Sequence, residues 1–197
     1  APSANLSGTV SPVTAGHVLA DLEGKIEAVL DGGHCPLGIE STVLDLTTRP
    51  PKVLRPGAVG VDRLEEALGE VSLGEAATQR YRPRAEVILV EAEGGRSALA
   101  AVVAQAGARG GKVGLAGSTE GVGGIEADAV EVWGRRADAA GIARNLYVCL
   151  RRLDEAGVDV IVAEGLSGPG YEAAMHRLRS AARRVVAPED VAALRGR

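Results

Sequence analysis

The chain has 197 residues, of which 46% are hydrophobic and 24% charged, which excludes a disordered chain and allows one or two globular domains. The formal net charge of −4 excludes the strongly basic surface that nonspecific nucleic-acid binding requires. Phenylalanine is absent, so we expect an aliphatic core. No apolar stretch has the length of a transmembrane helix, and we therefore expect no membrane contact and a location in the reducing cytoplasm.

The first half of the chain predicts short elements. Ser11 followed by Pro12 is typical of a helix N-cap and the first helical position, and Asp62 is typical of a second N-cap. The spacing of apolar residues then predicts, in chain order, a helix over residues 12–22, strands over residues 25–30, 41–46 and 52–54, and a helix over residues 63–68.

The second half predicts an α/β domain. Residues 70–84 have no periodicity and are interpreted as a linker between a domain over residues 1–69 and a domain over residues 85–197. Strands and helices then alternate, which predicts a small three-layer domain, with the apolar run 158–163 as a central parallel strand. The predicted elements are strands over residues 86–90, 112–116, 128–133 and 158–163, and helices over residues 97–106, 138–156 and 172–184.

Several single residues carry expectations about burial. Cys149 lies in an apolar helical pattern and is expected to be a small buried residue, and His17 is expected to pack on its own helix face. The basic run from Arg177 to Arg184 is interpreted as a solvated helix face. Solvated carboxylates are expected at Asp21, Glu23, Glu27 and Asp31.

Two polar groups in the first half are candidates for ligand binding. The hydroxyls and the amide of Ser3, Asn5, Ser7 and Ser11 precede a helix N-terminus and can hold phosphate oxygens, although plain capping and turn formation explain the same residues. The second group comprises Glu40, Ser41 and Thr42 at a strand start, with Arg55 suited to bidentate phosphate contact; solvation and a surface ion pair are the alternatives.

Two glycine-rich segments follow strands in the second half. Residues 114–124 lack the Gly-Lys-Ser/Thr ending of a P-loop and do not form a good dinucleotide fingerprint. Residues 165–170 follow the central strand, at the edge where α/β proteins usually bind ligands. A plain flexible loop is the preferred interpretation of the second segment.

Taken jointly, these motifs resemble the YrdC-like L-threonylcarbamoyl-AMP synthases. The first half carries PSANLSG at residues 2–8, ESTV at residues 40–43 and LRPG at residues 54–57. The second half resembles the accessory Sua-five domain of the long form, through residues 143–154 and 177–182. The resemblance implies the C-terminal part of a twisted YrdC-like α/β domain followed by a Rossmann-like domain, without the catalytic domain's N-terminal part and its basic residues.

The resemblance implies a reaction in which L-threonine, bicarbonate and ATP with Mg²⁺ give threonylcarbamoyl-AMP and pyrophosphate. It implies ATP or adenylate contacts at Ser3, Ser11, Arg55 and the linker residue Tyr81. It implies L-threonine contacts at Ala1 and Ser41, with Asn5 and Thr42 as secondary candidates. No catalytic residue and no protein ligand for a metal is assigned. The linker departs from the family, because residues 73–83 read LGEAATQRYRP where a Ser-Pro-Gly-Met motif is typical.

Such an enzyme, a nucleotidyltransferase, would supply proteins that modify the adenosine beside the anticodon of certain tRNAs, with no direct sequence-specific RNA binding. Two other classes stay open: an inactive nucleotide- or RNA-associated binding fragment of the family, and a structural interaction domain. We further expect residues 1–70 to be the less stable half and residues 85–187 to fold independently, because strands without neighbours leave open edges.

Overall fold

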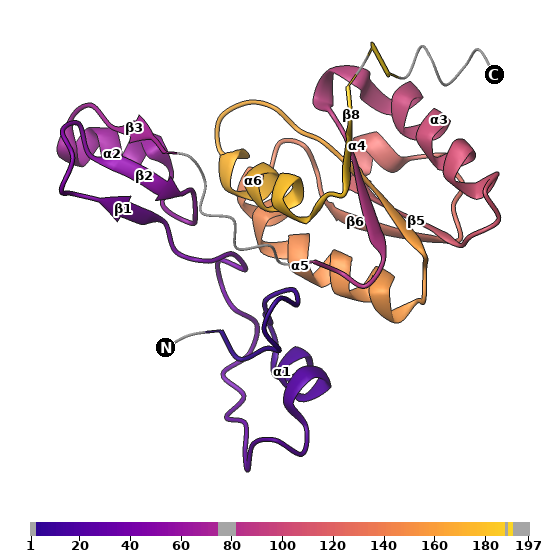
Figure 1. The fold of residues 1–197 in the computed structure, drawn as a ribbon, viewed down its shortest axis with the longest axis horizontal. Helices are drawn as coiled ribbons and strands as arrows, with labels where there is room; N and C mark the ends of the chain where they lie inside the picture. The colour runs from indigo at the N-terminus through magenta and orange to yellow at the C-terminus, as the bar shows by residue number, and fades with distance from the viewer. Residues whose placement is uncertain (1–2, 75–81, 188, 191–197) are drawn as a thin grey trace.

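The computed structural model describes residues 3–74, 82–187 and 189–190 (Figure 1). We call residues 3–74 the N-terminal part and residues 82–187 the C-terminal domain. The N-terminal part contains α1 (Ala15–Leu22), β1 (Val43–Asp45), β2 (Lys52–Arg55), α2 (Val61–Leu68) and β3 (Ser72–Leu73). The C-terminal domain contains β4 (Glu86–Val90), the short 3₁₀ helix η1 (Ala92–Gly94), α3 (Gly95–Gly107), β5 (Val113–Ser118), α4 (Thr119–Val122), β6 (Ala129–Gly134), α5 (Ala139–Glu155), β7 (Val160–Glu164), α6 (Glu172–Ala181) and β8 (Arg184–Val186).

The C-terminal domain is built on a five-stranded sheet in the order β6-β5-β7-β4-β8, in which every neighbouring pair is parallel. Successive residues of β4 point to opposite faces of this sheet. Val87 and Leu89 belong to a core cluster with residues of α5 and α6, whereas Ile88 and Val90 belong to a second cluster with residues of α3 and α4. The predicted three-layer α/β arrangement with β7 at its centre is therefore confirmed.

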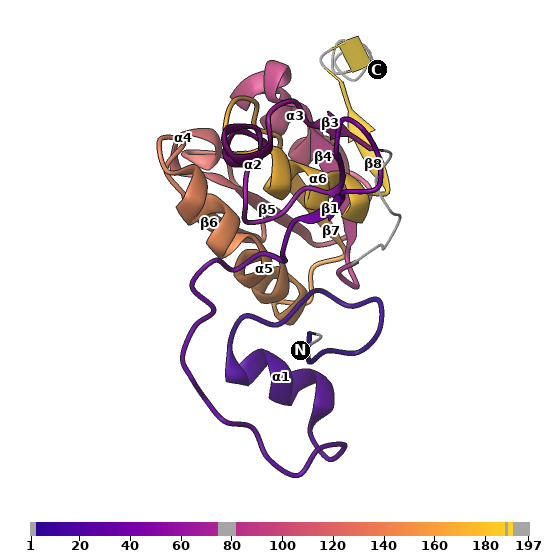
Figure 2. The same cartoon turned by 90° about the vertical axis from the view of Figure 1, so that its left-hand side faces the viewer.

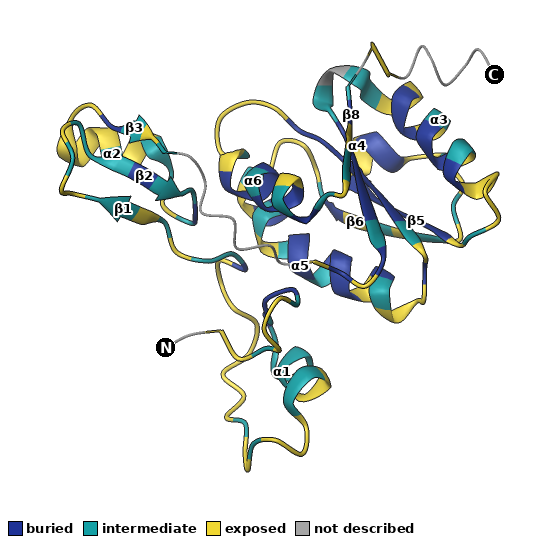
Figure 3. Cartoon of the chain, in the orientation of Figure 1, coloured by how far each residue is buried: buried dark blue, intermediate teal, exposed yellow. Residues whose placement is uncertain are grey.

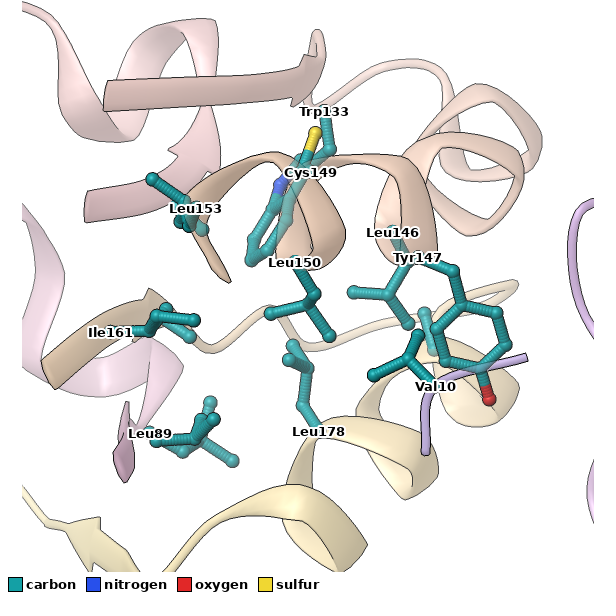
Figure 4. Packing of buried hydrophobic residues seen from close by; sticks show 14 of the residues in the cluster. Val10, Leu89, Trp133, Leu146, Tyr147, Cys149, Leu150, Leu153, Ile161 and Leu178 are labelled. Carbon is teal, nitrogen blue, oxygen red and sulfur yellow. The ribbon is translucent and has the colours of Figure 1, made fainter. Parts of the chain in front are cut away.

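The first core cluster lies between the sheet and helices α5 and α6 (Figure 4). Cys149 is 2% exposed, as predicted, and burial raises the pKa of its thiol to about 12. Val10 and Val13 of the N-terminal part also belong to this cluster, and Figure 4 shows Val10 beside Tyr147 of α5. The N-terminal part therefore contributes to the core of the C-terminal domain.

Two elements of the C-terminal domain differ from the prediction. The helix expected over residues 172–184 ends at Ala181, and the chain continues into β8, which pairs in parallel with β4. The glycine-rich stretch after residue 114 contains most of β5 and the single turn α4. β8 depends on pairing with β4, and α4 has only four residues, so local periodicity reports neither element.

The N-terminal part holds a three-stranded sheet in the order β1-β2-β3, with β1 antiparallel and β3 parallel to β2. β3 falls inside the segment 70–84 that the sequence analysis interprets as a linker. Helix α1 lies beyond α5 on the side away from the sheet, in two perpendicular views (Figures 1 and 2).

Three predictions for the N-terminal part are wrong. The N-cap of α2 is Gly60 rather than Asp62, which lies in the first turn of the helix. The strand expected over residues 25–30 is absent from the described residues, because alternation produces a strand only where a neighbour can pair with it; Leu30 is 98% exposed. The N-cap of α1 is Thr14 rather than Ser11, since the Thr14 side chain accepts a hydrogen bond from the His17 backbone N–H at 3.2 Å. Ser11 is thereby left for another role.

Burial differs sharply between the two parts (Figure 3). The central strands of the C-terminal sheet are almost wholly buried, whereas much of the chain around α1 is exposed. Among the described residues, none of the helices combines the length and apolar character needed to cross a membrane.

Candidate functional site

The best-formed pair of candidate residues is Ser41 and Arg55. Arg55 ends β2 and lies opposite Val43 of antiparallel β1, which brings its side chain back to Ser41. Its Nε and Nη2 donate to the Ser41 carbonyl oxygen at 3.2 and 3.0 Å, and Nη2 also lies 3.3 Å from the Ser41 hydroxyl. Within the described ranges no carboxylate pairs with Arg55, so its charge is available to an anionic ligand.

The turn after Arg55 packs directly on the strand entry at residues 40–42. A Cβ atom on Gly57 would overlap the backbone of Ser41 and Thr42, so only glycine fits there. Ala58 N–H donates to the Glu40 carbonyl oxygen at 3.1 Å. The Thr42 hydroxyl donates to the Val59 carbonyl oxygen at 2.7 Å and accepts from the Val59 N–H at 3.1 Å, so this side chain braces the turn.

Glu40 is the centre of a polar cluster that joins the two parts of the molecule. Its Oε1 accepts a hydrogen bond from the Ser11 hydroxyl at 2.7 Å, and its Oε2 accepts from Arg177 Nε of α6 at 2.7 Å. The Tyr147 hydroxyl of α5 lies 3.0 and 2.9 Å from the two carboxylate oxygens. We call Ser11, Glu40, Tyr147 and Arg177 the Glu40 cluster.

The Glu40 cluster is buried and charged. The side chains of Arg177 and Glu40 are 4% and 14% exposed. Burial by itself raises the pKa of Glu40, but the hydrogen bonds from Arg177 and Ser11 and the charge of Arg177 outweigh it and lower the pKa below the ordinary value. Burial and the neighbouring Glu40 charge raise the pKa of Tyr147, so Tyr147 stays a hydrogen-bond donor.

Helix α6 also carries His176, whose pKa is affected by the charge of Arg55. Burial is the main cause that lowers the pKa of His176, and the charges of Arg177 and Arg55 lower it further. His176 is therefore neutral near neutral pH, and its Nδ1 lies 2.8 Å from Arg177 Nη1. The positive charge at this edge of the candidate site comes from arginine rather than from histidine.

The remaining candidates lie in a separate loop. Ser3 is exposed and, with Pro12, Thr14 and residues 29–36, lines a cavity of about 450 Å³. Asn5 Nδ2 donates to the carbonyl oxygens of Leu6 and Thr9 at 2.9 and 3.1 Å and so shapes its own turn. The described residues show no contact between this loop and Arg55.

The structure therefore assembles only part of the predicted site. Ser11 and Ser41 lie on either side of Glu40, and Arg55 lies against Ser41, whereas Ser3 and Asn5 stand apart. Ala1 and Tyr81 lie outside the described residues, and their assignments stay predictions.

Two expectations about charged residues are wrong. Arg177, expected on a solvated face, is buried against Glu40. Asp21, expected to be solvated, accepts a hydrogen bond from Arg151 Nη2 of α5 at 2.7 Å, and the same arginine donates to the Val10 carbonyl oxygen. Tyr147 and Arg151 are one helical turn apart and lie beside the apolar face of α5, and polar residues that flank such a face are a signal that could have revealed both contacts.

The carboxyl end of the parallel sheet carries its own ion pair. Glu164, at the end of β7, is 3% exposed and accepts hydrogen bonds from Ser118 N–H at 2.5 Å and from Arg136 Nη2 at 2.5 Å. Its carboxylate occupies the space next to Gly117 and Gly121, where a Cβ atom would overlap it. The edge at which α/β proteins usually bind ligands is thus filled here by a side chain of the domain.

Over residues 3–74, 82–187 and 189–190, no three His, Cys, Asp or Glu residues gather in a way that could hold a metal ion.

Comparison with known families gives two matches along the chain. The family described as threonylcarbamoyl-AMP synthase, C-terminal domain, matches residues 61–183. The family of Sua5, YciO and YrdC proteins, described as telomere recombination, matches residues 1–57. The order of the two matches is the order that the motifs predict.

Individual relatives agree with these families. The threonylcarbamoyl-AMP synthase of Pyrococcus abyssi is 41% identical over 198 residues, covering 92% of this chain and 56% of that protein. The Bacillus subtilis protein of the same name is 36% identical over 196 residues, with 92% and 56% coverage. The crystal structure of P. abyssi Sua5 complexed with L-threonine matches with a TM-score of 0.83 and 41% identity over 94% of this chain and 58% of that chain.

The chain thus spans a little over half the length of each of these relatives. The predicted fold class and the predicted family resemblance are both confirmed.

Proposed function

The chain belongs to the family of the threonylcarbamoyl-AMP synthase C-terminal domain, and from this membership we infer that it is part of an enzyme that converts L-threonine, bicarbonate and ATP into threonylcarbamoyl-AMP and pyrophosphate. The observation that carries the proposal is the Ser41–Arg55 pair, which places at one edge of a small sheet a hydroxyl and a guanidinium that no carboxylate of the described residues pairs with. The solved P. abyssi relative was crystallised with L-threonine, which supports the same ligand here.

The proposal assigns roles to the described residues. Arg55 would bind phosphate oxygens of ATP through the N–H groups that Ser41 leaves free, and Ser41 would bind L-threonine. Ser3 and Ser11 would bind the adenylate portion. Chemistry of this kind asks the protein mainly to hold the reactants together and to stabilise charge, which hydroxyls and an arginine in fixed positions can do.

The remaining parts of the proposal concern the cell. Mg²⁺ would arrive with ATP, held by its phosphate oxygens, with no ligand assigned among the described residues. The product would pass in the cytoplasm to proteins that modify tRNA, so the chain itself would not need to recognise an RNA sequence.

Isothermal titration of the chain with MgATP tests the role of Arg55. We expect Arg55→Met to lower the affinity for MgATP by about ten- to a hundredfold, because a charge-assisted contact to phosphate contributes about 1.5–3 kcal/mol. The matched control is Arg63→Met, since Arg63 is exposed and pairs with Glu66 on α2. Equal affinities in wild type, Arg55→Met and Arg63→Met would contradict the proposed site.

A further inference from the structure

The segment from Gly38 to Thr42 is clamped from both sides. On one side, Gly38 lies directly on the backbone of Arg144 in α5, where a Cβ atom would overlap that backbone. On the other side, Gly57 packs on the backbone of Ser41 and Thr42. The segment is therefore held between helix α5 of the C-terminal domain and the turn that follows Arg55.

Side-chain contacts reinforce this clamp at one residue. Among the described residues of the segment, only Glu40 has a side chain that is hydrogen-bonded to the C-terminal domain. Its partners there are Tyr147 and Arg177. The same carboxylate accepts the hydroxyl of Ser11, and the next residue in the chain is Ser41. A buried ion pair holds its geometry tightly, because moving either charge away leaves the other without compensation.

We propose that Glu40 is a positioning residue that fixes the positions of Ser11 and Ser41. Glu40 is itself held by Tyr147 and Arg177 of the C-terminal domain. The ligand affinity of the N-terminal part therefore depends on the C-terminal domain. The identity of the ligands rests on the proposed function, whereas the positioning itself does not. Glu40 touches no reactant in this scheme, since its carboxylate oxygens are already engaged by the cluster.

The matched variants are Glu40→Gln and Asp21→Asn. Each replaces a carboxylate by an amide of the same shape where a buried arginine of the C-terminal domain binds it, Arg177 in one case and Arg151 in the other. Only the first belongs to the Glu40 cluster. Tyr147→Phe is a milder variant that removes a single hydroxyl from the same cluster.

Amide hydrogen exchange measures the positioning without any ligand. The N–H groups of Ala58 and Val59 are reporters, because they donate to the Glu40 carbonyl oxygen and to the Thr42 hydroxyl. We expect their exchange to accelerate about tenfold in Glu40→Gln and less in Tyr147→Phe, and to stay unchanged in Asp21→Asn. Equal exchange in Glu40→Gln and wild type, or equal acceleration in Asp21→Asn, would overturn the proposal.

Titration with L-threonine measures the consequence for binding. We expect Glu40→Gln to weaken the affinity about tenfold and Asp21→Asn to leave it within about twofold, although both variants lower stability. A merely structural role would lower stability in both and leave the affinity of the folded protein equal, which would overturn the proposal. Absence of L-threonine binding in wild type would instead count against the proposed function, and the exchange result would still decide the role of Glu40.

Discussion

At the scale of the residue, the charges that matter most are the buried ones. The charges of Glu40 and Arg177 compensate each other, and Ser11 and Tyr147 donate hydrogen bonds to Glu40. The charges of Asp21 and Arg151 compensate each other near Val10. Removing one partner of such a pair costs about 3–5 kcal/mol, far more than an exposed pair such as Arg63–Glu66 contributes. These two arginines are therefore structural members of the contact between the parts.

The lowered pKa of Glu40 predicts how stability depends on pH. Because its folded-state pKa lies below the ordinary value of 4.5, the Glu40 carboxylate stabilises the fold above that value, and its contribution is lost as the pH falls through the folded-state pKa. Wild type should therefore have a smaller stability advantage over Glu40→Gln at a pH below 4.5 than at pH 7.

Urea unfolding at the two pH values measures this advantage. Taking the difference between wild type and Glu40→Gln removes the contributions of Asp21 and His17, which titrate in both proteins. A difference that stays constant across the range would show that the pKa of Glu40 is not lowered in the folded state.

At the scale of the element, α5 is the support on which the N-terminal part rests. Asp138 caps this helix by accepting a hydrogen bond from Gly141 N–H at 2.8 Å. Further along the helix, the backbone of Arg144 packs against Gly38. Tyr147 then donates a hydrogen bond to Glu40, and Arg151 donates one to Asp21. One helix thus carries three successive contacts with a part of the chain more than a hundred residues away.

Gly38→Ala should disturb this contact more than a glycine substitution elsewhere. Gly38 has a φ of +63°, and a Cβ atom there would also overlap the Arg144 backbone. The control is Gly33→Ala, at a φ of +87° with no atom within 4 Å of the added Cβ. Both changes cost about 1–2 kcal/mol of backbone strain, and the overlap at Gly38 adds about 1–3 kcal/mol.

Urea denaturation of the two alanine variants gives the comparison directly. The midpoint should fall further for Gly38→Ala than for Gly33→Ala. Equal midpoints would mean that α5 and the segment after Gly38 are not in contact in solution.

At the scale of the whole molecule, the apolar surface is divided unevenly. Of the large hydrophobic residues that are exposed, most belong to the N-terminal part: Leu6, Leu19, Leu30, Leu37, Val43, Leu46, Val59, Leu68 and Leu73. The two core clusters draw almost all of their residues from the C-terminal domain. Because burial of apolar surface is the main source of stability, the C-terminal domain should be the more stable part.

Limited proteolysis checks this expectation. Cleavage should begin within residues 3–74 and leave a resistant fragment that contains residues 85–187, identified by mass spectrometry. Early cleavage inside β4 to β7, with residues 3–74 intact, would contradict it. Until this measurement is made, the lower stability of residues 1–70 and the independent folding of residues 85–187 stay predictions from the sequence.

Local patterns were enough to identify the C-terminal domain. The strand over residues 86–90, the long helix of α5 and the central position of β7 follow from apolar runs and helical spacing, because each element buries a face that its own sequence encodes. The motifs of the first half likewise identified the family, and through the resemblance they assigned Ser41 to L-threonine and Arg55 to ATP. What local patterns could not report was the absence of a strand at residues 25–30 or the presence of β8, since both depend on a neighbouring strand.

The sequence by itself therefore determined the elements of the sheet domain and the family, whereas the tertiary structure alone decided how the candidate site is held. Glu40 meets Tyr147 across 107 residues and Arg177 across 137 residues of chain. Periodicity and capping act within a few residues, so no local signal specifies which carboxylate a distant arginine will reach. Only packing of the N-terminal part against α5 and α6 brings these charges together, and their burial then makes the contact specific.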